Sequence, residues 1–207
     1  VVSHAGHLFL DLIGAALAGV DTPEAEATMM ALESLMPGGG PCTMWGTSRK
    51  CSPSGAALFN GVIAHARELD DFGGADHSGA VVVPAVLAIV DASHQISGKK
   101  TLESLIVGYE IGRRVLDGAG GYRSHNHGDG YHSTGTCGSF AATAAVAKAL
   151  DLNLLQTTWA LGLAGSFTGG TWAFAHDGAM SKRYHVGRAA ETGVTAGYFA
   201  RSNFSGP

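Results

Sequence analysis

Charged residues and long apolar runs are both scarce in this chain of 207 residues. Lys, Arg, Asp and Glu make up 14% of it, with 13 basic and 17 acidic residues and a net charge of −4. No block of like charge stands out, which argues against a nucleic-acid groove or a membrane-binding stripe. No apolar run reaches the roughly 18 residues of a membrane span, and residues 1–4 lack the basic start of a signal peptide. We therefore expect neither a nucleic-acid nor a membrane partner.

Cysteine is also rare, with only Cys42, Cys51 and Cys137 present. Their odd number and low density do not suggest a disulfide framework. A bridge between Cys42 and Cys51 is an alternative to two reduced thiols, and the reduced form is favoured. A reducing, cytoplasmic compartment is the resulting expectation.

Strand-like segments are few, whereas Ala-rich and amphipathic segments are many. The 31 glycines are about twice the usual share. They suit closely packed helices, and loops that need a positive φ near a ligand. Strand–helix alternation is absent, which argues against a doubly wound α/β fold. The pattern predicts an all-α fold with helices over residues 7–19, 23–35, 54–69 (or from 52), 84–93 (or from 81), 102–116, 134–150, 154–164 and 182–201.

Ionisable residues concentrate in three polar loops, at residues 70–79, 118–131 and 166–180, and at the helix ends beside them. In the first region, the run from His65 to Asp71 and the segment Asp76–Gly79 put acids next to histidines. This combination could make a general acid/base site. Spacing alone favours a polar helix end followed by a solvated loop.

The second region combines His125, His127 and Asp129 with His132. These are zinc-ligand residue types, but histidines in a Gly-rich loop are more often solvated, so we predict no metal site. His132–Thr136 enters a helix, where free backbone N–H groups favour a bound carboxylate. The alternative there is a simple Ser/Thr helix cap.

In the third region Lys182, His185 and Arg188 fall at helical spacings and share a face. Three cationic or potentially cationic groups on one face suit a di- or tricarboxylate. The alternative is a solvated basic face, but charge is scarce enough in this chain to make the cluster informative. Motifs of serine hydrolases, P-loop enzymes and dinucleotide-binding domains are missing in the required strand–turn–helix context.

Three separated segments resemble the signature of the MmgE/PrpD family. They are Asn60–Asp71 continuing into His77–Ala85, then His132–Phe140, then Asp177–Ala190. The similarity keeps its order from about residue 8 to residue 207. The family includes 2-methylcitrate dehydratase, cis-aconitate decarboxylase and iminodisuccinate epimerase. The resemblance implies a large helical domain, a smaller α/β lid domain, a homodimer, and neither a metal nor an organic cofactor.

The resemblance also implies roles for individual residues. Matched position by position, the catalytic candidates are Glu68, His77, His132 and Lys182. Further residues of the same segments are expected to bind substrate: Asp71, Thr136, Arg183, His185 and Arg188. The chain departs from the family at Phe72-Gly73-Gly74, where Thr or Gly followed by His is common, and at Ser78 and Ser133, where Pro is common.

The family usually has a helix before residue 8 and continues beyond Pro207. We therefore expect residues 1–207 to be a single helical domain, incomplete at both ends and without the α/β lid. The expected function is that of a 2-methylcitrate dehydratase-like lyase, which eliminates water from a small tricarboxylate by proton abstraction α to a carboxylate. The alternatives are an enzyme like cis-aconitate decarboxylase or iminodisuccinate epimerase and, from another class, a truncated non-catalytic dimerisation module.

Overall fold

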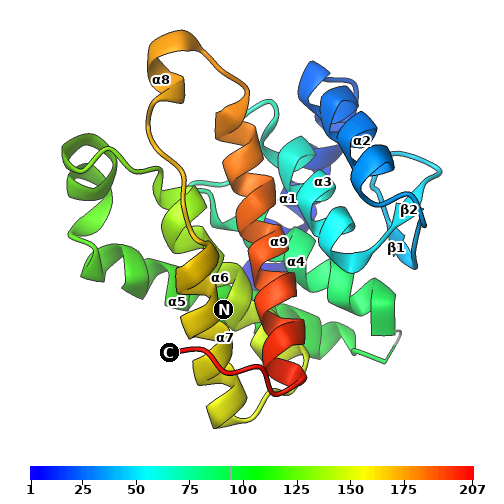
Figure 1. Cartoon of the computed structure of the whole chain (residues 1–207), viewed down its shortest axis with the longest axis vertical. Coiled ribbons are helices and arrows are strands. Elements are labelled where there is room, and N and C mark those ends of the chain that lie inside the picture. Colours follow the sequence, from blue (N-terminus) through cyan, green and yellow to red (C-terminus); the bar gives the residue numbers. More distant parts are fainter. Residues whose placement is uncertain (94) are drawn as a thin grey trace.

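The computed structural model describes residues 1–93 and 95–207, which form a helical domain with one short two-stranded ribbon (Figure 1). The predicted all-α class is confirmed. The elements in chain order are α1 (Val2–Ala18), α2 (Pro23–Leu35), β1 (Cys42–Thr43), β2 (Lys50–Cys51), α3 (Pro53–His65), α4 (Ser78–Ser93), α5 (Gly98–Gly118), the π-helix η1 (Arg123–Gly128), α6 (Ser133–Ala149), α7 (Leu154–Phe167), α8 (Phe174–Asp177) and α9 (Ser181–Arg201).

Helix α9 lies at the centre of the fold and packs against α3, α4, α6 and α7 (Figure 1). Small residues let these helices approach closely. A Cβ atom at Gly193 of α9 would lie 2.5 Å from Cβ of Ala142 in α6. A Cβ atom at Gly61 of α3 would lie 2.9 Å from Cα of Gly187 in α9. Both distances are well inside ordinary carbon–carbon contact, so these glycines are required by helix packing.

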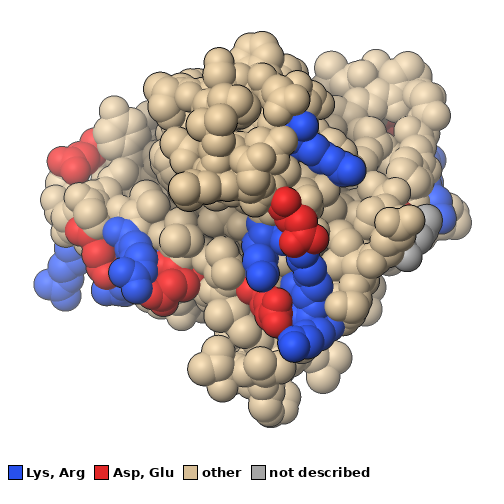
Figure 2. Space-filling model, turned by 90° about the horizontal axis from the view of Figure 1, so that it is seen from below, with Lys and Arg blue, Asp and Glu red and all other residues tan. Residues whose placement is uncertain are grey.

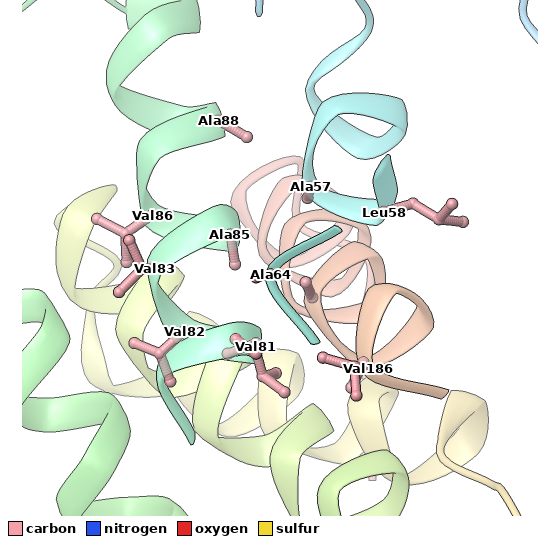
Figure 3. Close-up of a cluster of buried hydrophobic side chains, with 14 of the residues drawn as sticks. Ala57, Leu58, Ala64, Val81, Val82, Val83, Ala85, Val86, Ala88 and Val186 are labelled. Atoms are coloured by element: carbon pink, nitrogen blue, oxygen red, sulfur yellow. The ribbon is translucent and has the colours of Figure 1, made fainter. Parts of the chain in front are cut away.

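The apolar core surrounds α4, whose Val81, Val82, Val83 and Val86 are fully buried. Figure 3 shows valines and alanines of α4 beside residues of α3 and Val186 of α9. A helix that is apolar all round must be covered all round, and α3, α5, α6 and α9 cover this one. The helix begins at Ser78 and continues through Pro84, earlier than the sequence predicted. Burial of the valines outweighs the single hydrogen bond that proline removes.

Several expected boundaries are confirmed by their caps. The side chains of Thr22 and Ser52 accept hydrogen bonds from the backbone at the starts of α2 and α3, and each precedes a proline in the first turn. Other expectations were wrong. Helix α1 begins at Val2 instead of residue 7, and the expected loop at 166–180 contains the short helix α8. Helix α3 ends at His65 instead of continuing to Leu69, and the expected loop at 118–131 contains the π-helix η1.

Cys42 and Cys51 face each other across the β1–β2 ribbon, yet both are free thiols, as is Cys137. Burial raises the pKa of Cys42 and of Cys51 to about 11, which keeps both thiols protonated near neutral pH.

Surface charges are interspersed on the face shown in Figure 2, where Lys and Arg side chains lie next to Asp and Glu. Pairs along α5 are typical: Arg113 lies 2.8 Å from Asp117, and Arg114 lies 2.6 Å from Glu110. Within the described residues, no single helix has the length and apolarity of a membrane span. Helices α1 and α2 taken together have the length and composition of a membrane span, but they are bent by 86° relative to each other.

Candidate active site

A carboxylate held between two histidines forms one side of the site. Asp70 follows α3 and has a fully buried side chain. Its oxygens lie 2.9 Å from Nδ1 of His65, at the end of α3, and 3.0 Å from Nδ1 of His77. Burial opposes ionisation of Asp70, but hydrogen bonds from both rings hold its pKa below the ordinary value. Because Asp70 engages Nδ1 of His77, the Nε2 atom of that ring is left for chemistry.

A second buried carboxylate lies on the other side of His77. Asp76 accepts hydrogen bonds from the hydroxyls of Ser133, at 2.8 Å, and Thr134, at 3.1 Å, in the first turn of α6. Its Oδ1 atom lies 3.7 Å from Nε2 of His77, and its Oδ2 atom lies 4.0 Å from Nε2 of His132. Asp76 is therefore located between the two histidines that the sequence predicted as acid/base groups.

His132 immediately precedes α6 and is fully buried. Its Nδ1 atom lies 3.2 Å from Nδ1 of His185 in α9, so one of these rings donates and the other accepts. Trp172 and Phe174 pack edge-on against His132, with ring centroids 5.5 and 5.2 Å away. Burial, reinforced by neighbouring positive charge, lowers the pKa of His132 to about 2, so this ring is neutral.

The cationic part of the site comes from the first turn of α9. Nζ of Lys182 lies 2.8 Å from Oε2 of Glu68, and Nη2 of Arg183 lies 3.0 Å from Oε1 of the same carboxylate. Burial opposes ionisation of Glu68, but the hydrogen bond from Lys182 holds its pKa below the ordinary value. Glu68 has a φ of 52°, which is uncommon for a non-glycine residue. Its carboxylate occupies the position at which both cations could bind an anionic group of a substrate.

Three of the four catalytic candidates come from distant segments of the chain and converge. His77 and His132 flank Asp76, and Lys182 is close enough for its charge to lower the pKa of both rings. Burial also lowers the pKa of His77, but Asp70 and Asp76 outweigh these effects and raise it above the ordinary value. The two imidazole pKa values are thus pushed apart, which is typical of an acid and a base in one active site.

Asp71 is oriented differently from the residue before it. The hydroxyl of Tyr109 in α5 donates to its two oxygens, at 3.0 and 2.9 Å. The carboxylate also packs against Gly79, where a Cβ atom would overlap it. Asp71 lines a cavity of about 580 Å³ between α1, α5 and the 71–74 loop. The structure does not bring Asp71 to the histidines, and its expected substrate contact stays a prediction.

Other predicted binding residues lie at the margin of the cluster. The hydroxyl of Thr136 lies 2.6 Å from Nε2 of His125, and Arg188 donates to Glu191 at 2.7 Å. A cavity of about 240 Å³ lies against His185 and Arg188, on the α9 side of the cluster. Arg183 and His185 therefore join the cluster through Glu68 and His132, whereas Thr136 and Arg188 reach only its edge.

Sequence reasoning named the segments but missed three residues of the cluster: His65, Asp70 and Asp76. His65 lies in the last part of the helix predicted over residues 54–69, where a polar residue is ordinary. Asp70 and Asp71 are adjacent in a loop, and only Asp70 turns toward His77. Loop residues follow no periodicity, so the sequence does not show which of the two faces the histidine. The only sequence signal for Asp76 was its position directly before a candidate histidine.

One metal-binding combination exists among the described residues. His65, Asp70 and His77 each place a potential ligand atom within 4.8 Å of the others. These residue types suit zinc. However, both rings direct Nδ1 at the carboxylate at hydrogen-bond distances of 2.9 and 3.0 Å, so we interpret the group as a hydrogen-bonded network.

Comparison with known proteins identifies the family of the chain. The family model described as the MmgE/PrpD N-terminal domain matches residues 1–207. The chain is 35% identical over 214 residues to the cis-aconitate decarboxylase-like protein oryM of Aspergillus oryzae. It is 28% and 26% identical over 211 residues to the cis-aconitate decarboxylases of Homo sapiens and Mus musculus.

These alignments cover 100% of this chain but 44%, 43% and 42% of the respective relatives, so the chain spans less than half of their length. The names of these relatives refer to cis-aconitate decarboxylation, and the expected 2-methylcitrate dehydration is not confirmed. Because the family model covers every residue, the chain belongs to the MmgE/PrpD family and corresponds to its N-terminal domain.

Proposed function

We propose that this chain supplies the acid, the base and a carboxylate-binding cation of a lyase that acts on a small polycarboxylate, of the cis-aconitate decarboxylase type. The observation that carries the proposal is the arrangement of His77 and His132 on either side of Asp76, with the charge of Lys182 close by. The decarboxylase names of the relatives support this reaction over the dehydration expected from sequence.

Lys182 and Arg183 would bind a substrate carboxylate. Both now hold Glu68, whose side chain is 41% exposed and can move aside or share them. An anion at this position would form charge-assisted hydrogen bonds of the kind that Glu68 forms. The same cations would stabilise negative charge that develops on the carboxylate during the reaction.

His77 would supply the proton. In decarboxylation of cis-aconitate, the C–C bond to the carboxylate on the methylene carbon breaks, and CO₂ leaves. The electron pair forms a new double bond, and the electrons of the original double bond take a proton at the carbon α to another carboxylate. Asp70 fixes Nδ1 of His77, and the raised pKa favours the protonated ring, so Nε2–H would be the donor.

His132 would act as the base where a step requires one. Its lowered pKa keeps it neutral in the apolar enclosure of Trp172 and Phe174. In a dehydration, neutral His132 would take the proton α to a carboxylate while His77 protonates the departing hydroxyl. One site geometry therefore serves both reactions, and the substrate decides between them.

The test is to incubate the intact protein separately with cis-aconitate, 2-methylcitrate and iminodisuccinate in D₂O and to follow the products by NMR. We expect cis-aconitate to be consumed, with CO₂ released and one deuterium at the carbon α to a retained carboxylate. Selective turnover of 2-methylcitrate would restore the dehydratase assignment. If none of the three acids reacts, the non-catalytic dimerisation module becomes the better description. The homodimer implied by the resemblance and the cytoplasmic location expected from the rarity of cysteine stay predictions, and sedimentation analysis tests the first.

A further inference from the structure

Asp76 is the least explained charged group of the site. Its side chain is buried, and its Oδ1 atom has no hydrogen-bond partner among the described residues. Nε2 of His132 is likewise buried and without a partner in that part of the chain. Buried polar atoms almost always have a hydrogen-bond partner. An unpaired oxygen of Asp76 and an unpaired ring nitrogen beside it therefore point to a position that a substrate or water fills.

The carboxylate of Asp76 is held firmly. Its Oδ2 atom accepts from Ser133 and Thr134, and the backbone oxygen of Asp76 accepts from the N–H of Gly73 at 2.6 Å. Ser133 is itself fixed, because the amide of Asn126 donates to its hydroxyl at 3.0 Å and accepts from its backbone N–H at 2.7 Å. Asn126 is the buried residue of the π-helix η1. The π-helix η1 thus positions Asn126, which holds Ser133 against the carboxylate of Asp76. Such helices are frequent at functional sites.

The backbone of Asp76 is also unusual, with a φ of 98°. A non-glycine residue in this region is strained and persists only where the surrounding structure imposes it. The strain directs the carboxylate toward His77 and His132, 3.7 and 4.0 Å from their Nε2 atoms. These separations exceed a direct hydrogen bond and leave room for a bridging atom.

We infer that Asp76 is a positioning residue that stabilises the mobile proton of the site on the Nε2 atoms of His77 and His132. The inference rests on the proposed function, in which these rings are the acid and the base. In the proposed decarboxylation, His77 ends the cycle without its proton and must regain one at Nε2, beside the Asp76 carboxylate. In a dehydration, His77 likewise ends the cycle without its proton, and His132 ends it with one. A proton that returns from one Nε2 atom to the other restores the starting state, and it passes the Asp76 carboxylate on the way.

Several charges face His77, and Asp76 acts among them. Asp70 bonds its Nδ1 atom, and the ring of His65 lies at a centroid distance of 4.3 Å, tilted by 58°. Lys182 contributes opposing positive charge from α9. Asp76 is the carboxylate on the Nε2 side, where the proton is transferred. Removal of its charge should therefore weaken proton retention by His77 without disturbing the Nδ1 bond to Asp70.

The test is Asp76→Asn in the intact protein, because asparagine is nearly isosteric and tolerates a positive φ. Histidines labelled with ¹³C at Cε1 are titrated by NMR, and a His77→Gln variant assigns the His77 signal. We expect the His77 titration to move to lower pH by about one unit or more, as for loss of an opposite charge within 4–6 Å. With a substrate that is turned over, kcat should fall at least tenfold with KM changed less than threefold, and the alkaline limb of the pH profile should move with the NMR titration.

Two further variants keep the result decisive. Asp129→Asn makes the same chemical change at an exposed loop residue and should leave titration and turnover unchanged. Ser133→Ala loosens the carboxylate but retains its charge, and it should give a smaller shift even if Asp76→Asn does not fold. An unshifted His77 titration in a folded Asp76→Asn protein overturns the inference, as does lost turnover with an unchanged pH profile. The NMR titration needs no substrate, so it tests Asp76 even if the proposed reaction is wrong.

Discussion

Addition of one methyl group to a glycine should have opposite effects at two helix positions of this fold. At Gly193, in the middle of α9, the new Cβ would lie 2.5 Å from Cβ and 2.7 Å from the carbonyl carbon of Ala142. At Gly14, in α1, it would meet nothing within 4 Å. The pair separates the packing role of glycine from its backbone cost.

The magnitudes follow from the two environments. Alanine is better than glycine in a helix interior by about 1 kcal/mol, and both variants gain this amount. Only Gly193→Ala also forces α6 and α9 apart, by about 1 Å if ordinary carbon contact is to be restored. Overpacking of this kind costs about 1–3 kcal/mol, and the neighbour here is helix backbone, which cannot rotate away. We therefore expect Gly193→Ala to be destabilising by up to about 2 kcal/mol and Gly14→Ala to be stabilising by up to about 1 kcal/mol.

The assay is thermal and chemical unfolding of both variants beside the parent protein. The difference between them is the overpacking cost of about 1–3 kcal/mol, which corresponds to roughly 2–12 °C in Tm for a domain of this size. Gly193→Ala should also lower turnover, since α6 and α9 carry His132 and Lys182. If Gly193→Ala is as stable as Gly14→Ala, close packing of α6 and α9 is not the reason for the glycine.

Three further predictions concern single side chains. Lys182→Ala in the intact protein should lower kcat/KM by orders of magnitude, whereas Lys99→Ala on the exposed face of α5 should leave kcat/KM unchanged. Near-normal turnover of the Lys182→Ala variant would show that Lys182 is not part of the site. The raised pKa of His77 means that its contribution to stability is full below the unfolded-state value of about 6.5 and is lost as pH rises through the folded-state pKa. Activity that needs its proton should fall over that same range, so an alkaline limb of the rate profile below about 6.5 would contradict this role. Tyr109→Phe removes a hydrogen bond to the half-buried carboxylate of Asp71 and should lower the free energy of unfolding by about 1.5–3 kcal/mol at pH 7, as measured by denaturation. Because burial raises the pKa of Asp71, this loss should shrink in acid; a loss that is the same at pH 4 would refute the explanation.

Much of the fold could be predicted from the sequence because helix signals are local. Thr22 followed by Pro23 marked the start of α2, and the spacing of apolar residues marked α5, since both depend on neighbours within one or two turns. The boundaries at Ser78 and His65 could not be predicted in this way. They depend on burial of valines around Pro84 and on the pairing of His65 with Asp70, which are tertiary effects.

The sequence by itself determined the helical class, the family and the segments from which the site is built. Only the tertiary structure decided which residues of those segments face one another. Asp70 and Asp71 are adjacent and chemically identical, yet one bonds two histidines and the other bonds Tyr109. Asp76 meets Ser133 across 57 residues of chain. Loop residues follow no periodicity, and the direction of each side chain is fixed by the helices packed around it, which is a property of the assembled core.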